Sequence, residues 1–234
     1  MGEMIDFPSN GNMCSGYLAT PKSGHGPGVV VIQEWWGLVP HIKDICDRLA
    51  REGFVAVAPD LFHGKQTFEP DEAGKLVMAM RLDEAARDML GAVSWLSNSD
   101  RTAGDRVGIV GYCVGGSLSL YAATLSPHIG CAVLFYPGLA FPAVQQADLS
   151  KISGAVLGQF AENDHSYTRE QVADLERRLR EAGIDVEFFW YAGADHGFFN
   201  DDRPAVYNPD AAQLAWDRTL AFFRRHLAVT ATPV

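Results

Sequence analysis

A single cysteine, Cys113, lies between two glycines in the stretch Gly-Tyr-Cys-Val-Gly at residues 111–115. This pattern is typical of a tight strand-to-helix turn that presents a nucleophile, because larger side chains two positions away would collide across the turn. The positive end of the following helix would favour a thiolate there. The pattern therefore predicts Cys113 as a nucleophile, with the backbone N–H of Val114 directed at a developing oxyanion. The alternative interpretation is an unreactive thiol on a glycine-rich turn, since free cysteines are often buried.

A nucleophile of this kind needs a base, and His196 is placed to be one. It follows an apolar run at residues 186–191 and directly precedes a glycine. His63 and His165 also follow predicted strands, and a histidine in such a turn can simply be exposed to solvent. We nevertheless predict His196 as the base, because ligands bind beyond the carboxyl ends of parallel strands.

The group that orients this base is predicted to be Asp164, which lies just past the apolar run at residues 155–160. Glu162 and Asp195 are competitors, and an acidic residue in a polar loop is usually just solvated. The order along the chain favours Asp164, because nucleophile, acid and histidine follow one another in this order in the α/β-hydrolase fold.

The run at residues 28–33 is followed by Glu34, Trp35 and Trp36. A carboxylate at the end of a buried strand costs free energy unless it is paired or functional, although a rim carboxylate in water is the alternative. The backbone N–H of Trp35 is predicted as a second oxyanion donor, since the loop after this strand supplies one in such folds. Trp36 is predicted to line an apolar substrate pocket, and packing in the core is its alternative role.

The elements that would position these residues alternate along the chain. Continuous apolar runs predict strands that are buried on both faces, as in a parallel sheet. The predicted strands span residues 28–33, 54–59, 106–111, 131–136, 155–160 and 186–191. The predicted helices span residues 41–52, 83–97, 168–182 and 210–226, the third beginning with a capping box of Thr168 and Gln171. Residues 3–7 and 16–20 predict an antiparallel hairpin before the first buried strand.

This alternation predicts a three-layer α/β fold with a mostly parallel central sheet and helices on both faces. The length of 234 residues fits one domain, 1–234, in which residues 230–234 form a loose tail. A net charge of −10 argues against a nucleic-acid partner. No apolar run is long enough for a membrane span, and no secretory signal begins the chain.

The four cysteines match no paired metal-binding spacing, and a chain of this length needs no disulfide scaffold. A cytoplasmic protein with free thiols is therefore expected. The sequence leaves the oligomeric state open.

The best markers of kinship are the stretches QEWWGL, APDLF, VGYCVGG, END and DHGFFN. With them the chain resembles the dienelactone hydrolase family of the α/β-hydrolases over nearly its whole length. The resemblance implies a Cys113–His196–Asp164 triad, with Glu34 holding the resting thiol and taking its proton when an anionic substrate enters. The family reaction opens the enol-lactone of dienelactone to maleylacetate and needs no metal or cofactor.

The resemblance also implies arginines that receive the substrate carboxylate, and Arg203 and Arg81 are the candidates. Arg203 lies seven residues after His196, further than the substrate-binding arginine of the dienelactone-specific enzymes. Arg81 is the nearest match to the second arginine, but it falls beside a predicted helix start and is equally well explained as a solvated helix charge.

The leading hypothesis is a cysteine-dependent hydrolase of small-molecule esters or lactones that works through a thioester acyl-enzyme. One alternative is a broad esterase or thioesterase for neutral substrates. Another is a non-catalytic ligand-binding or thiol-redox module in which Cys113 is oxidised. A metal-dependent hydrolase is disfavoured because the pairs Asp164-His165 and Asp195-His196 do not form a known metal-binding motif.

Overall fold

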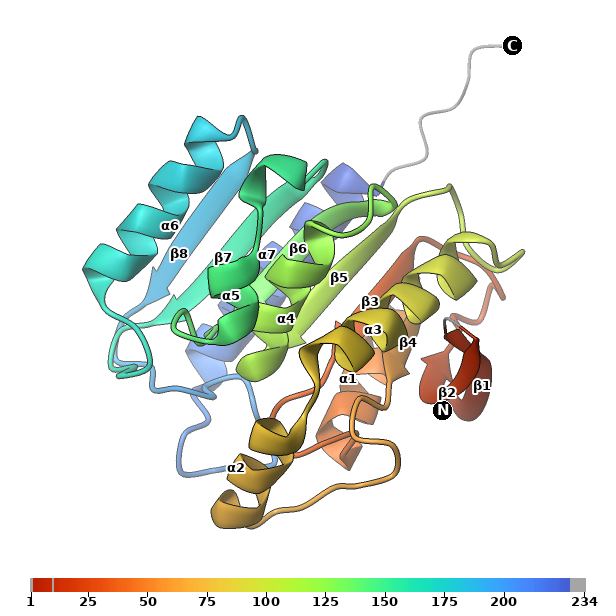
Figure 1. Cartoon of the computed structure of the whole chain (residues 1–234), viewed down its shortest axis with the longest axis horizontal. Coiled ribbons are helices and arrows are strands. Elements are labelled where there is room, and N and C mark those ends of the chain that lie inside the picture. Colours follow the sequence, from red (N-terminus) through yellow and green to blue (C-terminus); the bar gives the residue numbers. More distant parts are fainter. Residues whose placement is uncertain (1, 10, 228–234) are drawn as a thin grey trace.

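An eight-stranded sheet runs through the computed structural model, which describes residues 2–9 and 11–227 (Figure 1). The strand order is β1-β2-β4-β3-β5-β6-β7-β8. The strands are β1 (Glu3–Ser9), β2 (Asn12–Ala19), β3 (Gly28–Ile32), β4 (Val55–Pro59), β5 (Val107–Tyr112), β6 (Ile129–Phe135), β7 (Ala155–Ala161) and β8 (Val186–Tyr191). Strands β3 to β8 are mutually parallel, while β2 runs antiparallel to both β1 and β4.

The six strands predicted for the parallel part of the sheet are confirmed to within two residues at every end. Strands β3 to β7 are buried at every position, because their continuous apolar sequences lie between two layers of helices. The predicted hairpin is also confirmed, with Glu3 opposite Leu18 and Phe7 opposite Cys14. The predicted tail, residues 230–234, lies outside the described residues.

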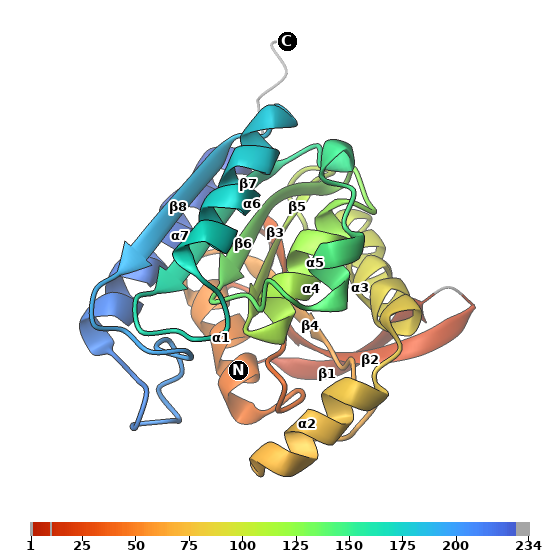
Figure 2. The ribbon, with the colours of Figure 1, turned by 60° about the vertical axis from the view of Figure 1, so that its left-hand side comes forward.

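Helices cover both faces of the sheet, with α1 and α7 on one face and α3, α4 and α6 on the other (Figures 1 and 2). The helices are α1 (Pro40–Arg51), α2 (Pro70–Ala79), α3 (Leu82–Ser97), α4 (Val114–Ala123), α5 (Pro142–Gln146), α6 (Arg169–Glu181) and α7 (Pro209–His226), with a 3₁₀ turn η1 (Leu149–Lys151). The predicted helices are confirmed, and Thr168 and Gln171 form the expected capping box. The expected three-layer α/β-hydrolase fold is therefore the observed one.

Helix α2 was not predicted, and its packing shows why. Of its residues only Ala73 is buried, so the sequence carries no apolar stripe of helical period. The short helix α5 likewise has too few turns for a periodic pattern. Helix α2 therefore contributes little to the core, whereas α5 places Ala143 and Val144 in it.

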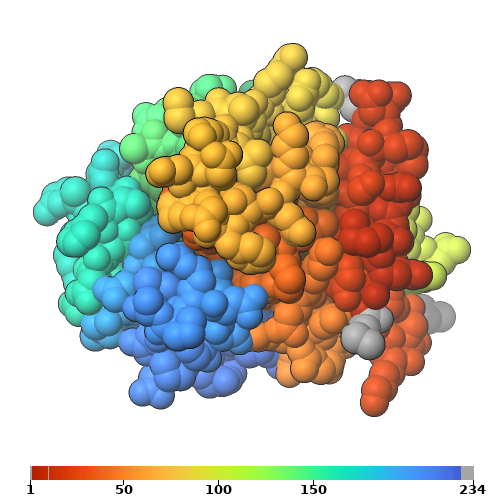
Figure 3. Space-filling view, turned by 90° about the horizontal axis from the view of Figure 1, so that it is seen from below, coloured from red at the N-terminus to blue at the C-terminus, as the bar shows by residue number. Residues whose placement is uncertain are grey.

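The carboxyl ends of the parallel strands gather on one side of the molecule. Seen from that side, the gold segment that contains α2 and the blue loop after β8 lie next to each other (Figure 3). The loops after β3, β5 and β7 end on the same side, so they can bring residues from distant parts of the chain together. Within residues 2–9 and 11–227, no helix combines the length and the hydropathy of a membrane span.

Candidate active site

Cys113 lies on a strained turn between β5 and α4, with φ 56° and ψ −121°. A non-glycine residue rarely adopts a positive φ, so the surrounding structure must hold it there. A Cβ at Gly111 would approach the carbonyl oxygen of Gly115 to 2.0 Å, and one at Gly115 would approach that of Gln33 to 2.4 Å. Both flanking positions therefore require glycine, for the steric reason that the sequence pattern indicated.

The turn also leaves backbone donors at the start of α4. The N–H of Gly116 donates to the carbonyl of Cys113 at 3.0 Å, while the first N–H groups of a helix have no acceptor within it. Val114 is the first residue of α4, and it lines the same cavity as Cys113 and Trp35. The two predicted oxyanion donors are thus brought to one site.

That cavity has a volume of about 310 Å³ at the carboxyl ends of the strands. It brings together most of the predicted site residues with several that the sequence did not single out. Its walls are formed by Glu34, Trp35, Trp36, Val77, Cys113, Val114, Ser117, Gly138, Phe141, Ser166, His196 and Arg203. A larger open depression of about 790 Å³, between the end of β2 and α1, contains none of the predicted site residues.

His196 and Asp164 form a close pair beside the thiol. The Nδ1 atom of His196 lies 2.6 Å from Oδ2 of Asp164, whose Oδ1 accepts the N–H of Ser166 at 2.8 Å. The histidine side chain is 33% exposed, whereas that of Asp164 is 1% exposed. The imidazole therefore faces the cavity with the carboxylate behind it.

The charges in this pair support each other. Burial raises the pKa of Asp164, but the hydrogen bonds from His196 and Ser166 outweigh it and hold that pKa below its ordinary value. Burial lowers the pKa of His196, but Asp164 and the Cys113 thiol outweigh it and raise that pKa from 6.5 to about 10. The protonated form of the His196 imidazole is thus stabilised by the carboxylate of Asp164 behind it.

The competing residues lie elsewhere. Glu162 is exposed and bonds Arg169, and Asp195 accepts a hydrogen bond from Asn163. His63 pairs with Asp88, and His165 is exposed to solvent. None of the four lines the cavity.

Glu34 is 2% exposed, so the alternative of a rim carboxylate in water is wrong. Its Oε2 accepts the amide of Asn200 at 2.6 Å, and its Oε1 accepts the hydroxyl of Tyr136 at 3.4 Å. Burial, together with the charge of Glu34, raises the pKa of Tyr136 well above its ordinary value, which keeps this hydroxyl a donor. Tyr136 also places its ring edge-on to His196, with the ring centroids 5.1 Å apart. The carboxylate is therefore held by two neutral donors inside the site.

The structure brings Arg203 to the cavity but not Arg81. The guanidinium carbon of Arg203 lies 5.1 Å from the ring centroid of Trp36, and among residues 2–9 and 11–227 no carboxylate forms an ion pair with it. Trp36 is 5% exposed and serves both proposed roles, packing in the core and lining the cavity.

Arg81 precedes α3 and pairs with Asp83 at 3.1 Å and with Glu84 at 3.4 Å. These acidic residues in the first turn of the helix hold the exposed guanidinium away from the cavity wall. The expectation that Arg81 contacts substrate therefore finds no support in its position.

Comparisons with known proteins identify the family of this chain. The family model for the dienelactone hydrolase family matches residues 14–227. The chain belongs to the dienelactone hydrolase family. It is 42% identical to Protein usf of Aquifex pyrophilus, over 97% of this chain and 100% of that one. It is 39% identical, over the same shares of both chains, to a protein of Aquifex aeolicus provisionally named carboxymethylenebutenolidase.

A solved structure shows the same likeness in three dimensions. The crystal structure of a provisionally assigned dienelactone hydrolase from Klebsiella pneumoniae superposes with a TM-score of 0.86 at 30% identity. The superposition covers 96% of this chain and 98% of that chain. The dienelactone hydrolase fold thus accounts for nearly the whole of this family member.

Sequence reasoning missed several residues of this family site. Tyr136 and Asn200 hold Glu34, and Val77 reaches the cavity from α2. Asn200 ends the marker stretch DHGFFN, so a signal for it was present. Tyr136 follows β6 with a positive φ of 36°, and neither its conformation nor its partner could be inferred from a Phe-Tyr-Pro sequence.

Proposed function

We propose that this member of the dienelactone hydrolase family is a cysteine-dependent hydrolase of ester and lactone bonds. The observation that carries the proposal is the half-buried thiol of Cys113 on its strained turn, sharing a cavity with the His196–Asp164 pair. Nucleophile, base and orienting acid are then present at one site, which is the arrangement that acyl transfer requires.

In the first half of the reaction, the Cys113 thiolate attacks the carbonyl carbon and forms a tetrahedral intermediate. The N–H groups of Val114 and Trp35 stabilise its oxyanion, an effect worth about 10²–10³ in rate per donor. When the intermediate collapses, the C–O bond breaks and the alkoxide takes a proton from His196. A thioester remains on Cys113, and a lactone substrate stays attached through its acyl part.

In the second half, water attacks the thioester while His196 accepts its proton. The C–S bond breaks, the Cys113 thiolate is restored and the carboxylic acid leaves. Asp164 keeps the Nδ1 proton on the imidazole, so that Nε2 faces the reacting atoms. No metal or cofactor takes part in either step.

Glu34 controls the resting state in this proposal. It lines the cavity with Cys113 and is held by Tyr136 and Asn200. As the family resemblance implies, it takes the thiol proton when an anionic substrate arrives. The charge of Arg203, which has no carboxylate partner among the described residues, supports an ester or lactone that carries a carboxylate.

A second candidate function is the hydrolysis of neutral esters or thioesters. The position of Arg81 favours it, because only one of the two expected arginines reaches the cavity. Arg203→Ala separates the two candidates. Under the first, kcat/KM falls for an anionic enol-lactone and not for a neutral aryl ester. Under the second, the wild type prefers the neutral ester and the variant keeps that preference.

The experiment that tests the proposal compares wild type and Cys113→Ala on a panel of lactones and aryl esters. We expect the variant to lose turnover on every substrate while circular dichroism and the melting temperature stay close to wild type. Cys14→Ala, which removes a buried thiol that does not line the cavity, is the matched control and should retain activity. Turnover by Cys113→Ala at the wild-type rate would refute the proposal. A thiol that reacts with iodoacetamide in a wild type that hydrolyses nothing would favour the thiol-redox module instead.

A further inference from the structure

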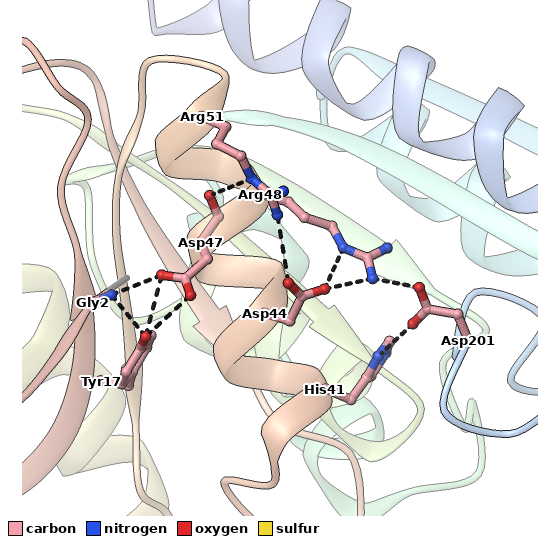
Figure 4. Close-up of polar contacts among 8 residues, drawn as sticks. All are labelled: Gly2, Tyr17, His41, Asp44, Asp47, Arg48, Arg51 and Asp201. Carbon is pink, nitrogen blue, oxygen red and sulfur yellow. Dashed lines mark hydrogen bonds and ion pairs between the residues drawn. The ribbon is translucent and has the colours of Figure 1, made fainter.

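A second histidine–aspartate pair lies behind the site, between α1 and the loop that follows β8. The Nδ1 atom of His41 is 3.2 Å from Oδ1 of Asp201, and the other oxygen of Asp201 accepts a hydrogen bond from Arg48. Arg48 also bonds Asp44 at 2.5 Å. Figure 4 shows Asp201 reached from α1 by both His41 and Arg48, which lie on one face of this helix. Two cationic or donating groups therefore converge on one loop carboxylate.

The loop that Asp201 belongs to also carries three groups of the proposed site. His196, Asn200 and Arg203 all lie on it, and Asn200 directly precedes Asp201. Backbone hydrogen bonds fold the loop tightly, from the N–H of Asn200 to Gly197 at 2.9 Å and from the N–H of Arg203 to Asn200 at 3.1 Å. A displacement of Asp201 would therefore move Asn200 away from Glu34 and Arg203 away from the cavity wall.

His41 is buried in an apolar environment, where a hydrocarbon side chain would cost less free energy to bury than an imidazole. It is 2% exposed, and its ring packs 6.5 Å from that of Tyr112 and 6.4 Å from that of Phe199. Its Nε2 atom and the hydroxyl of Tyr112 are both buried without a hydrogen-bond partner among the described residues. An unpaired buried polar atom is destabilising. The hydrogen bond between Nδ1 and Asp201 is therefore the polar interaction by which His41 can stabilise this region.

Arg48 keeps this carboxylate charged. Burial raises the pKa of Asp201, but the bonds from Arg48 outweigh it, so that pKa lies below its ordinary value. Arg48 itself is held between Asp44 and Asp201 and is only partly exposed. The contact between α1 and the loop is thus a charge-assisted one that survives at neutral pH.

We propose that His41 and Arg48 are positioning residues that, through Asp201, hold Asn200 against Glu34 and Arg203 at the cavity. The proposal rests on the function proposed above, and it assigns to α1 a share in the recognition of anionic substrates. His196 is anchored separately through Asp164, so loss of the α1 contact leaves the base in place. The contact therefore acts on substrate capture more than on the chemistry of acyl transfer.

The test compares Asp201→Ala, His41→Gln and Arg48→Gln with wild type on an anionic enol-lactone and a neutral aryl ester. We expect KM for the anionic lactone to rise about tenfold, the size of one charge-assisted contact, with less than a threefold change in kcat/KM for the neutral ester. Arg48→Lys should recover most of the loss, since an ammonium can still pair with Asp201. Arg51→Gln is the matched control, because Arg51 lies one turn further along α1 and bonds Asp44 but not Asp201.

Equal losses on both substrates, or no change in KM for the lactone in any of the variants, would overturn the proposal. Melting temperatures identify variants that fail to fold, and Arg48→Lys keeps the test decisive if Asp201→Ala is one of them. If wild type itself turns over neither substrate, the proposed function fails. If Cys113→Ala is inactive and the variants at Asp201, His41 and Arg48 lose activity equally on the anionic lactone and the neutral ester, only the positioning role fails.

Discussion

Two histidine–aspartate pairs of the same chemistry lie on the two sides of the loop after β8, with opposite exposure. In the first, His196 is 33% exposed and Asp164 is 1% exposed. In the second, the side chain of His41 is 1% exposed and that of Asp201 is 31% exposed. Both use Nδ1 of the imidazole, although the contact with the carboxylate is 2.6 Å in the first pair and 3.2 Å in the second. The difference lies in which partner is open to its surroundings.

This reversal of exposure between histidine and aspartate fits different proposed roles, proton transfer for the first pair and positioning of the loop for the second. An imidazole that faces a cavity can exchange protons with a bound molecule, and a carboxylate buried behind it keeps it oriented. An imidazole sealed among aromatic rings has no such access, and Asp201 already has the charge of Arg48 beside it. In the account proposed above, His41 therefore holds the loop, and His196 moves protons.

The largest expected difference between the two histidine–aspartate pairs is in the loss of turnover when each histidine is replaced. We expect His196→Gln to lower kcat/KM on a neutral aryl ester about 10³-fold, because general acid–base catalysis contributes 10²–10⁴. His41→Gln should lower it less than threefold on the same substrate. Steady-state kinetics on both variants check the comparison, and a similar loss in both would remove the distinction.

A smaller effect is on the pH dependence of stability. The raised pKa of His196 means that its contribution to stability is full below pH 6.5 and is lost as the pH rises to about 10. The lowered pKa of Asp164 means that its contribution is present above its ordinary pKa of 3.8 and is lost as the pH falls through the lowered value. We therefore expect Asp164→Asn to lower the free energy of unfolding by about 1–3 kcal/mol near pH 5.5.

Urea unfolding across this range measures that difference. The gap between wild type and Asp164→Asn should narrow in acid and again near pH 10. For Asp201→Asn, the gap should be about 1 kcal/mol and persist at pH 10, because Arg48 stays charged. A gap that is independent of pH for Asp164→Asn would contradict the account.

The smallest expected effect is that of Arg81 on the KM for an anionic lactone, because Arg81 belongs to neither histidine–aspartate pair and lies outside the cavity. Arg81→Ala should change KM for an anionic lactone less than twofold, because Arg81 pairs with Asp83 and Glu84 outside the cavity. Arg203→Ala, in the loop that Asp201 holds, should raise the same KM about tenfold. A larger effect of Arg81→Ala than of Arg203→Ala would show that a different surface receives the substrate.

Local patterns predicted the first pair and much of the fold. Continuous apolar runs identified the strands because those strands are buried on both faces, and the glycines around Cys113 identified its turn for a steric reason. The order of Cys113, Asp164 and His196 along the chain matched that of the α/β-hydrolase fold, but Glu162 and Asp195 obey the same order. The contact of Asp164 with Nδ1 of His196 separates it from these competitors.

The second pair and the setting of Glu34 had no such local signal. His41 and Asp201 are 160 positions apart, and only the packing of α1 beside the loop brings them together. The same holds for Tyr136, which reaches Glu34 from the end of another strand. Arg81 was the nearest match in the sequence to the second substrate-binding arginine of the family. In the structure its side chain pairs with a neighbouring carboxylate, that of Asp83.

The most direct test of the central claim is to trap the acyl group on the protein. His196→Gln should still be acylated slowly by an activated aryl ester at alkaline pH, while the missing base stalls hydrolysis of the thioester. Intact-mass and peptide analysis should then find one acyl group per chain on the peptide that contains Cys113, and none in the Cys113→Ala variant. An acyl group on another residue, or turnover of the ester by Cys113→Ala, would contradict the account.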